Sequence, residues 1–572
     1  MSAARVDCGN GVALERSVAC TLSDGTTLVS DHYYPSSTEH GDGPHPTLLM
    51  RQPYGRDIAS TVVYAHPIWF ARHGYNVVIQ DVRGRGGSEG SFYPFRQEGR
   101  DGAETIAWLR TRPECNGRIG MYGFSYQGAT QLLAAAEQPE GLQCIAPAMT
   151  ACDLFHGWFY HHGALRLASS LGWGLQMLKE DARRLGLHGA SAKLEAAWAN
   201  VRAQASHLPY AQHPAITDPA LPTYVRDWFS HDEPGEFWSD LDISTRASTI
   251  NIPALHVSGW YDTYLEGSIA GFELLRNHAG TEHARDNQYL LAGPWVHIPW
   301  GDRVGEANLG EAALLDTDDL LLRWFDHWLK DANTFTTEPR VKHFAMGTNT
   351  WHDADAAHAS AAITLHLASD GRAESRKGDG ALVEDEPSGP PDIFVYDPEV
   401  PVFAPGGPQA LSGLTDQSAL EQGNNLLVYT GDILEAPLHI FGRPSVSLHV
   451  QTSSAHADVT AKLVCVKPNG RAEFVCIGIA RSTFLFGDKS ISDVPQLWSF
   501  TLEPTSFVFA AGDRIRLEIA GCAFPLYDRN PSNSTRPSEM TVFNWQRCTH
   551  MVFHDREHPS SLQLPVLQEG YA

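Results

Sequence analysis

The serine at position 125 lies in a turn of small residues between an apolar run and a helical stretch. The turn spans residues 123–128, Gly-Phe-Ser-Tyr-Gln-Gly, and the apolar run before it spans residues 118–122. A sharp strand-to-helix turn of this type lifts the Oγ of Ser125 clear of a sheet, and glycines let the backbone pass close by. The first amides of the helix can then stabilise an oxyanion. Gly-x-Ser turns also occur in ordinary surface loops, so the prediction of a nucleophile depends on its partners.

A nucleophilic serine needs a base within hydrogen-bond reach and an acid that orients the base. In hydrolases with this turn the order along the chain is serine, acid, histidine, each at the end of a strand. Asp262 follows the apolar run 254–258, and His297 follows the run 289–292. Both lie just beyond an expected strand end, where open α/β sheets bind their ligands. Any one of the 27 histidines would be weak support alone. Order and placement together predict a triad of Ser125, His297 and Asp262.

The oxyanion of an acyl-transfer reaction needs two hydrogen-bond donors. The backbone N–H of Tyr126, the residue after the nucleophile, is the expected first donor. Lipase-type hydrolases place the second donor in a glycine-rich loop, but the equivalent loop here is Arg-Gln-Pro-Tyr-Gly at residues 51–55. We therefore expect the hydroxyl of Tyr54 to be the second donor. The alternative is a tyrosine that only packs the core or its rim.

The elements that must position these residues alternate between apolar strands and helices. Strands are expected at 47–50, 75–80, 118–122, 253–258 and 288–292, and helices at 103–109 and 314–330. Strands and helices in alternation predict a parallel sheet covered on both faces. Between about residues 155 and 238 the pattern changes to helical stretches, including 164–185 and 190–204, which predict a helical insertion.

Beyond residue 335, short segments of period-2 alternation are separated by Pro, Gly and Asp. Examples are residues 362–367, 444–450 and 514–519. This texture predicts an all-β sandwich or jelly roll. The fold class is therefore α/β, with a discontinuous α/β-hydrolase core at 1–150 and 240–335, a helical cap at 151–239 and a C-terminal jelly-roll domain at 336–572.

Composition limits the classes of partner. The formal net charge of −25 argues against nucleic acid and anionic membranes, because Lys and Arg are not in excess to neutralise phosphate. No apolar run reaches the ~18 residues of a membrane span, and the N-terminus does not resemble a secretory signal. The nine cysteines form no Cys-x-x-Cys pair and are expected to be reduced thiols rather than zinc ligands. We expect a cytoplasmic protein without metal or cofactor, and a homodimer is compatible with the sequence.

Several segments together resemble the cocaine esterase-like, or CocE/NonD, hydrolases, which are relatives of X-prolyl dipeptidyl peptidases and α-amino-acid ester hydrolases. The matching segments are residues 51–54, 81–90, 123–128, 259–262, 293–297, 323–329, 344–351 and 524–530. The resemblance extends over nearly the whole chain. It implies an α/β-hydrolase core with a helical cap and a C-terminal jelly roll, a Ser125–His297–Asp262 triad, and a tyrosine oxyanion donor at Tyr54.

One departure from the family concerns substrates that carry an amine. Members that hydrolyse α-amino esters bind the substrate ammonium with carboxylates, two of which closely follow the triad acid. Here Thr263, Tyr264 and Leu265 follow, and Glu266 comes one position late. An unpaired ammonium in a closed pocket would cost several kcal/mol, so α-amino esters are disfavoured as substrates.

Aromatic residues near these motifs suggest an apolar or aromatic acyl pocket, with packing of the cap against the core as the alternative. The candidates for substrate binding are Trp158, Phe159, Trp173, Trp260 and Tyr264.

Two further patterns imitate binding motifs. Residues 81–90 resemble a dinucleotide-binding loop, but a helix does not open directly after them and Pro94 disfavours one. We interpret them as a structural loop beside the site. His161 and His162 are adjacent, and adjacent residues on a helix point apart, so a shared metal ion is not expected.

These observations predict a serine esterase that cleaves small-molecule carboxylic esters through an acyl-enzyme. Activity should rise with pH through the range where histidine ordinarily titrates, ~6.5, because the base must be neutral. An amidase or X-Pro-type dipeptidyl peptidase, or an acyltransferase, would use the same triad. A carbohydrate-binding protein with a vestigial hydrolase domain is an alternative of another class, against which the complete triad argues.

Overall fold

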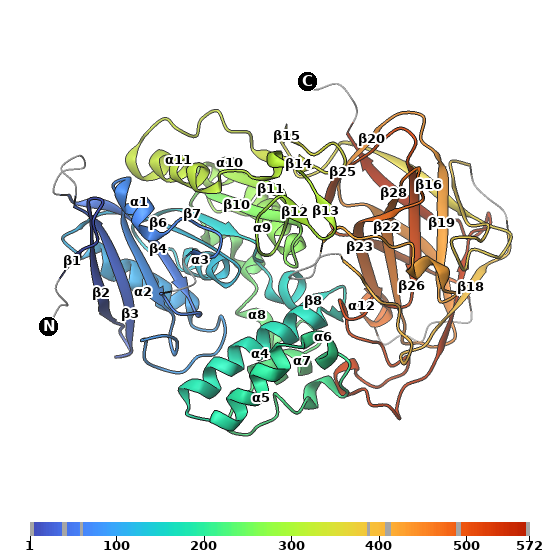
Figure 1. Cartoon of the computed structure of the whole chain (residues 1–572), viewed down its shortest axis with the longest axis horizontal. Coiled ribbons are helices and arrows are strands. Elements are labelled where there is room, and N and C mark those ends of the chain that lie inside the picture. Colours follow the sequence, from blue (N-terminus) through green and yellow to red (C-terminus); the bar gives the residue numbers. More distant parts are fainter. Residues whose placement is uncertain are drawn as a thin grey trace.

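A computed structural model describes residues 5–36, 43–57, 61–385, 389–406, 413–487 and 494–567. An α/β domain and an all-β domain lie side by side, and a group of helices from the middle of the chain lies against both (Figure 1). The predicted fold class is confirmed in these three parts: an α/β core, a helical insertion and a strand-rich C-terminal domain.

The α/β domain is built on a sheet with the strand order β1-β2-β3-β5-β4-β6-β7-β10-β11-β14-β15. In chain order its strands are β1 (Val6–Asp7), β2 (Val12–Thr21), β3 (Thr27–Pro35), β4 (His45–Gln52), β5 (Asn76–Asp81), β6 (Cys115–Phe124), β7 (Leu142–Ala148), β10 (Ala254–Tyr261), β11 (Gln288–Val296), β14 (Val341–Ala345) and β15 (Thr350–Ala354). The pairs from β5 to β14 are parallel, and the pairs at both margins are antiparallel. Every residue of β5, β10 and β11 is buried, as expected for parallel strands covered on both faces.

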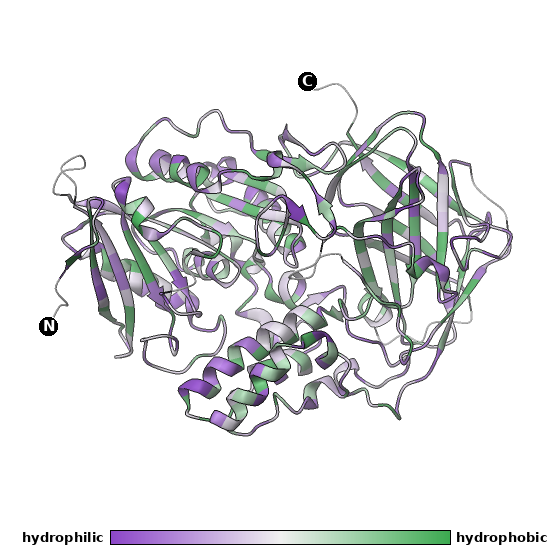
Figure 2. Ribbon diagram, in the orientation of Figure 1, coloured by the Kyte–Doolittle hydropathy of each residue, from purple (hydrophilic) through white to green (hydrophobic). Residues whose placement is uncertain are grey.

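Helices cover both faces of this sheet. They are α1 (Pro67–Arg72), α2 (Glu98–Arg110), α3 (Tyr126–Ala136), α9 (Leu265–His278), α10 (Glu282–Asp286), the 3₁₀ helix η5 (Glu311–Ala313) and α11 (Thr317–Lys330). Successive residues of β6 face opposite ways: Met121 packs in the core shared with α2 and α3, and Tyr122 packs in the core shared with α1 and α11. α11 carries both hydrophobic and hydrophilic residues (Figure 2), and Trp324 and Phe325 are its wholly buried ring residues.

The insertion between β7 and β10 is mainly helical. It comprises the π-helix η2 (Phe155–Phe159), the short strands β8 (Tyr160–His161) and β9 (Ala164–Leu165), α4 (Leu167–Arg184), α5 (His188–Trp198), α6 (Val201–Gln204), η3 (Tyr210–Gln212), α7 (Tyr224–Ser230), α8 (Glu236–Ser239) and η4 (Ile243–Thr249). α4 buries Leu171, Leu175 and Leu178, which share one face at helical spacing. Where one helix was expected over 190–204, α5 and α6 are separated by Ala199 and Asn200.

The described residues of the C-terminal domain form one hydrogen-bonded network of 13 strands. They are β16 (Ala361–Ala368), β17 (Ala381–Val383), β18 (Asp392–Tyr396), β19 (Leu426–Ile433), β20 (Leu438–Gly442), β21 (Ser445–Thr452), β22 (Asp458–Val466), β23 (Ala472–Arg481), β24 (Gln496–Thr501), β25 (Thr505–Phe509), β26 (Arg514–Ala520), β27 (Cys548–Phe553) and β28 (Ser561–Val566). The remaining elements are η6 (Leu420–Gln422), α12 (Ser482–Phe486), η7 (Pro537–Glu539) and, from the loop before α11, the pair β12 (Arg303–Val304) and β13 (Ala307–Asn308).

The strands that follow the expected boundary at residue 336 belong to the first sheet. β14 and β15 lie beyond it in the chain, yet β14 pairs in parallel with β11 and extends the first sheet. Strand periodicity alone does not say which sheet a strand joins, because that choice depends on contacts distant in sequence. The sheet of the α/β domain therefore extends to Ala354.

Within the described residues, no helix combines the length and the apolar character needed to cross a bilayer.

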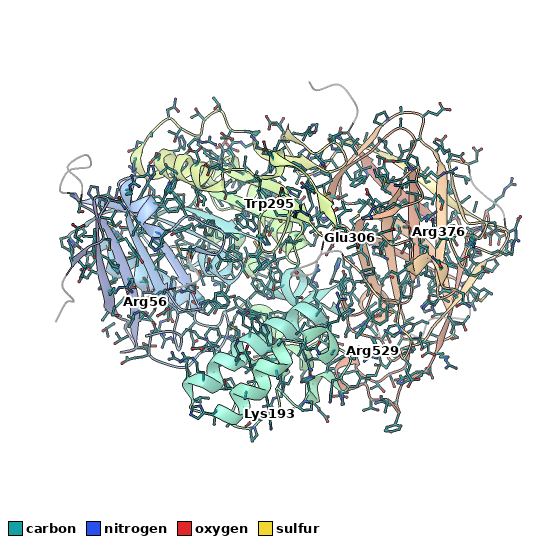
Figure 3. All side chains as sticks on the ribbon, viewed as in Figure 1. Arg56, Lys193, Trp295, Glu306, Arg376 and Arg529 are labelled. Carbon is teal, nitrogen blue, oxygen red and sulfur yellow. The ribbon has the colours of Figure 1, made fainter. Side chains whose placement is uncertain are left out.

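The insertion is held to the all-β domain by polar contacts. Arg529, labelled in Figure 3 where the two parts meet, donates to the hydroxyl of Tyr210 at 3.0 Å and to the carbonyl of Ser206 at 3.1 Å.

Candidate active site

Ser125 occupies the strained turn that its sequence predicts. β6 ends at Phe124, α3 begins at Tyr126, and Ser125 between them has φ 60° and ψ −127°. A Cβ at Gly123 would lie 2.5 Å from the Cβ of Gln127, and one at Gly128 would lie 2.8 Å from the Cβ of Thr150. The glycines are therefore needed for this turn to pack. The positive φ of Ser125 is a strained backbone conformation, which is often found at functional residues.

His297 and Asp262 meet at the carboxyl ends of two adjacent parallel strands. Asp262 directly follows β10 and His297 directly follows β11. The Nδ1–H of His297 donates to the Oδ1 of Asp262 at 2.6 Å, and the carboxylate is wholly buried. With Nδ1 bonded in this way, Nε2 is left as the ring acceptor, which is the tautomer a general base needs.

The loop of His297 is fixed close to the serine. The ring of Phe124, the neighbour of Ser125, lies 5.5 Å from the imidazole between centroids. The indole N–H of Trp300 donates to the carbonyl of His297 at 3.1 Å, and its ring stacks on Trp295 at 5.5 Å. Trp300 was not among the predicted site residues, and its only signal in the sequence is its position three residues after the candidate base.

The hydroxyl of Tyr54 lies at the serine. It interacts with the side chain of Ser125, and it accepts the indole N–H of Trp173 at 3.2 Å. Burial raises the pKa of Tyr54 to about 12, so the phenol is protonated and can donate at neutral pH. A donor that itself accepts a hydrogen bond is polarised and donates more strongly.

Tyr126, the other predicted donor, is anchored through its side chain. Its hydroxyl donates to the Oε1 of Glu98 at 2.7 Å and accepts the backbone N–H of Phe95 at 3.0 Å. Arg51, at the end of β4, forms an ion pair with Glu98 at 2.9 Å. Both carboxylate and guanidinium are buried, so the first turn of α3 is attached to β4, the strand that precedes Tyr54.

Aromatic side chains form a wall beside the triad. The ring of Tyr264 packs edge-on against His297 at 5.2 Å and stacks on Trp158 at 3.9 Å. Trp158 lies 5.7 Å from Trp173, whose indole is bonded to Tyr54. Phe95 contacts Tyr126, Trp158 and Trp173 with centroid distances of 4.6, 5.1 and 5.6 Å. Phe95 was missed because nothing in its local sequence separates it from an ordinary core residue.

Two of the predicted substrate-binding residues make their shortest contacts away from the candidate triad. Phe159 is wholly buried inside the insertion, where its ring packs on Trp228 and Trp238 at 4.6 and 5.2 Å. The indole of Trp260 is buried and donates to the carbonyl of Phe344 in β14 at 2.7 Å. Sequence proximity to a motif does not determine on which face of a strand or helix a ring points.

The all-β domain provides charged partners around the triad acid. Arg443 bonds both Glu266 and Glu273 of α9, the helix that follows Asp262, at 2.9 Å each. Arg166 of the insertion pairs with Glu503 of the all-β domain at 3.0 Å, and both side chains are buried. Burial raises the pKa of Glu503 to about 7. Glu266, the first carboxylate after Asp262 in the chain, is thus already paired with Arg443.

The two motif-like patterns have local roles. Arg85 of the 81–90 loop stacks on Phe92 with its Cζ 3.8 Å from the ring centroid, and it pairs with Asp181 of α4 at 3.0 Å. His161 bonds the hydroxyl of Tyr527 at 2.7 Å, and His162 bonds the carbonyl of Ile479 at 2.9 Å. In the part of the chain that the structure describes, no three His, Cys, Asp or Glu side chains group as metal ligands.

Comparisons with known proteins agree with this architecture. Residues 24–299 match the X-Pro dipeptidyl-peptidase (S15 family) model, and residues 333–563 match the X-Pro dipeptidyl-peptidase C-terminal non-catalytic domain. The chain is 30% identical to cocaine esterase from Rhodococcus sp. (strain MB1 Bresler), with 96% of this chain and 98% of the relative covered.

Solved structures share the fold over nearly the full length. An aminopeptidase from the marine sediment archaeon Thaumarchaeota archaeon superposes with a TM-score of 0.81 at 22% identity, covering 96% of each chain. An α-amino acid ester hydrolase superposes with a TM-score of 0.78 at 23% identity, covering 98% of each chain.

Proposed function

The chain belongs to the X-Pro dipeptidyl-peptidase (S15) family of hydrolases, together with cocaine esterase, and we propose that it cleaves carboxylic esters with Ser125, His297 and Asp262. The observation that carries this proposal is the 2.6 Å hydrogen bond between His297 and Asp262, which follow β11 and β10 in the sheet whose strand β6 leads to Ser125 in its strained turn. No cofactor enters the proposed reaction.

In the proposed mechanism, Ser125 attacks the ester carbonyl while the Nε2 of His297 takes the hydroxyl proton. Asp262 holds the ring through Nδ1 and stabilises the imidazolium as it forms. The tetrahedral oxyanion is bound by the hydroxyl of Tyr54 and the backbone N–H of Tyr126. His297 then protonates the leaving alkoxide. In the second half, water deprotonated by His297 attacks the acyl-enzyme and releases the acid.

The proposed substrates have apolar or aromatic acyl groups. Support comes from the wall of Trp158, Trp173 and Tyr264, rings that follow each other at contact distance from the oxyanion donor to the base. Flat rings in such a wall favour the binding of apolar acyl groups, because binding buries apolar surface. Aromatic acyl groups gain in addition from stacking on the rings.

An amine on the acyl group is not favoured in this proposal. Glu266 is bonded twice by Arg443, so binding a substrate ammonium there would require breaking an existing ion pair. Amide cleavage and acyl transfer would use the same triad, and the assay below separates amide cleavage from ester hydrolysis.

The test is hydrolysis of p-nitrophenyl esters from acetyl to benzoyl, with a p-nitroanilide that carries the acyl group of the best ester. Ser125→Ala should lose ester turnover by about 10⁴-fold or more, and Ser169→Ala, in the insertion, should retain it. Anilide turnover close to ester turnover would replace the esterase proposal by an amidase. Turnover that survives Ser125→Ala would remove the proposed nucleophile.

A further inference from the structure

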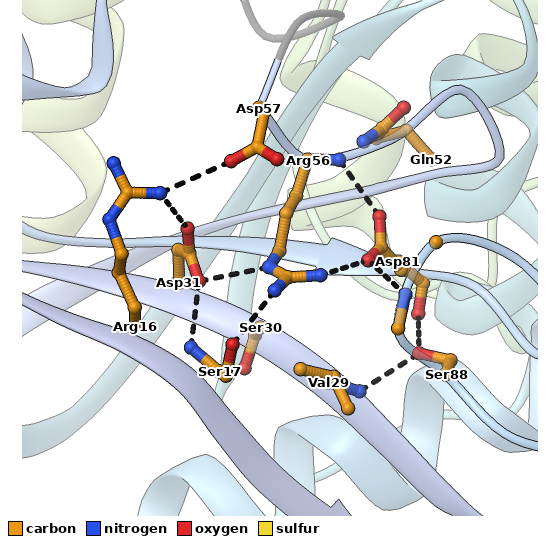
Figure 4. Close-up of polar contacts among 12 residues, drawn as sticks. Arg16, Ser17, Val29, Ser30, Asp31, Gln52, Arg56, Asp57, Asp81 and Ser88 are labelled. Carbon is orange, nitrogen blue, oxygen red and sulfur yellow. Dashed lines mark hydrogen bonds and ion pairs between the residues drawn. The ribbon is translucent and has the colours of Figure 1, made fainter. Parts of the chain in front are cut away.

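The loop that carries Tyr54 is attached to the sheet by a buried ionic network. Tyr54 is the second residue after β4, which ends at Gln52. The backbone N–H of Tyr54 donates to the Oε1 of Gln52 at 2.8 Å. Two residues later, the backbone N–H of Arg56 donates to the Oδ1 of Asp81 at 2.8 Å. The guanidinium of Arg56 also bonds the Oδ2 of Asp81 at 2.5 Å (Figure 4). Asp81, the last residue of β5, therefore binds this loop through both of its carboxylate oxygens.

Arg56 is held from a second side by the antiparallel strands. Its Nε donates to the Oδ1 of Asp31 in β3 at 2.9 Å, and its Nη2 donates to the Oγ of Ser17 in β2 at 2.9 Å. The fork of the guanidinium thus spans three strands, as Figure 4 shows. Since arginine donors are fixed in one plane, contacts in three directions leave the backbone at Arg56 little freedom to shift.

The 81–90 segment is folded around the carboxylate of Asp81. The backbone N–H of Gly87 donates to the Oδ2 of Asp81 at 2.9 Å, and the hydroxyl of Ser88 donates to its carbonyl at 2.6 Å. A Cβ at Gly86 would lie 2.0 Å from the Oδ2, so only glycine fits there. Asp81 is wholly buried. The glycine-rich motif therefore serves a protein carboxylate in this chain.

We propose that Asp81 is a positioning residue for the oxyanion donor, holding the Tyr54 hydroxyl in place through Arg56. This inference rests on the proposed function, because it assigns to Asp81 an effect that passes through Tyr54. Burying a carboxylate and a guanidinium costs desolvation, and a hydrophobic pair could often stabilise a fold as well. A buried carboxylate paired with a partly buried guanidinium, two residues from a side-chain donor, instead defines where that donor lies, and displacement by ~1 Å can cost ~100-fold in rate.

The first experiment measures kcat and KM for p-nitrophenyl esters in Asp81→Asn, which keeps the shape of the side chain and removes its charge. We expect kcat to fall by about 10- to 100-fold with KM within about threefold, because the donor acts mainly in the transition state. Asp57→Asn is the matched control. Asp57 follows Arg56 directly but is exposed, and among the contacts drawn in Figure 4 it pairs only with Arg16. The kcat of the Asp57→Asn enzyme should therefore stay within about threefold of wild type.

The second experiment repeats the substitution in a Tyr54→Phe background. Because the donor is already absent there, Asp81→Asn should change kcat by less than about threefold, so the two losses should be strongly non-additive. Arg56→Lys serves where Asp81→Asn folds poorly. It keeps a cation near Asp81 and loses the fork, and it should lower kcat only when Tyr54 is present.

The outcomes separate this inference from the proposed function. If Tyr54→Phe lowers kcat but Asp81→Asn lowers it equally in both backgrounds, Asp81 acts through the general fold and the inference is wrong. If Asp81→Asn leaves kcat unchanged in the wild-type background, the inference is also wrong. If Tyr54→Phe itself has no effect on kcat, the oxyanion role of Tyr54 is wrong.

Discussion

Replacing Tyr54 with phenylalanine tests the unusual half of the proposed oxyanion hole. The substitution keeps the ring and removes a hydroxyl that contacts Ser125 and accepts the indole N–H of Trp173 at 3.2 Å. In hydrolases of this mechanism, loss of one oxyanion donor lowers kcat by about 10²- to 10³-fold, or ~2.7–4 kcal/mol of transition-state stabilisation. The remaining donor, the amide of Tyr126, is backbone and is unaffected. We therefore expect a loss within that range.

The same structure predicts where the loss does not appear. The hydroxyl binds the oxyanion more tightly than the ground-state carbonyl, so KM should change by less than about threefold. The Trp173 N–H loses its acceptor, at ~1 kcal/mol of folding stability. The assay compares kcat and KM for p-nitrophenyl esters together with the urea midpoint of unfolding.

Tyr93→Phe is the matched control, since its hydroxyl also makes one strong bond, to Asp227 at 2.8 Å, and lies in the insertion contact rather than at Ser125. Tyr93→Phe should retain kcat. A Tyr54→Phe enzyme whose kcat stays within about threefold of wild type would refute the role of Tyr54, as would a loss that appears only in KM.

Three further results are expected. Asp262→Asn should lower kcat by about 10⁴-fold with little change in KM, because the imidazole loses its oriented tautomer. Single-turnover kinetics measure the loss, and a loss of less than about tenfold would contradict the role of Asp262. Burial raises the pKa of Tyr54 to about 12, so kcat should show no alkaline decline below about pH 10; a midpoint near the ordinary tyrosine value of ~10 would contradict a protonated donor. Burial lowers the pKa of His343 to about 3 and the pKa of His439 to about 4, below the ~6.5 of a histidine in the unfolded chain. Between these values the unfolded state binds more protons than the folded state. The urea midpoint of unfolding should therefore fall as the pH falls from ~6.5 to ~4. His343→Gln should weaken that fall, and an unchanged slope would contradict it.

The strand-end placement of the three candidate triad residues could be predicted from the sequence because it depends on local signals. Each follows an apolar run that becomes a buried strand, β6, β10 or β11, and parallel strands bring their carboxyl ends to one edge of the sheet. Strand order was not needed. The expected runs at 254–258 and 288–292 end earlier than the observed strands, which end at Tyr261 and Val296. The residue directly after each observed strand is still the candidate acid, Asp262, or the candidate base, His297.

The direction of aromatic rings could not be predicted in the same way. Trp158 and Phe159 are adjacent in η2, yet one stacks on Tyr264 and the other packs inside the insertion. Trp260 lies two residues before Asp262, yet its indole bonds β14. These outcomes depend on segments far away in sequence, and a π-helix changes the facing of residues relative to an α-helix.

The role of Asp81 was hidden for a different reason. Its motif, with glycines at 84, 86 and 87, has the composition of a loop that binds an external anion. The structure places a protein carboxylate at Gly86 and Gly87, with the amide of Gly87 directed at it. Glycine composition reports that an anion comes close to the backbone, and it does not report whether that anion is a ligand or a residue of the same chain.

A side-chain donor in the oxyanion hole makes different demands from a backbone donor. The Tyr126 amide is fixed by the first turn of α3, whereas the Tyr54 hydroxyl lies at the end of a rotatable side chain on a loop. Its placement therefore depends on contacts at both ends: Trp173 bonds the hydroxyl, and Gln52 and Arg56 fix the backbone on either side. In return, a phenol that accepts an indole N–H is polarised and donates more strongly than it would alone. We infer that rate losses from substitutions outside the triad should concentrate along the path from Asp81 to Tyr54.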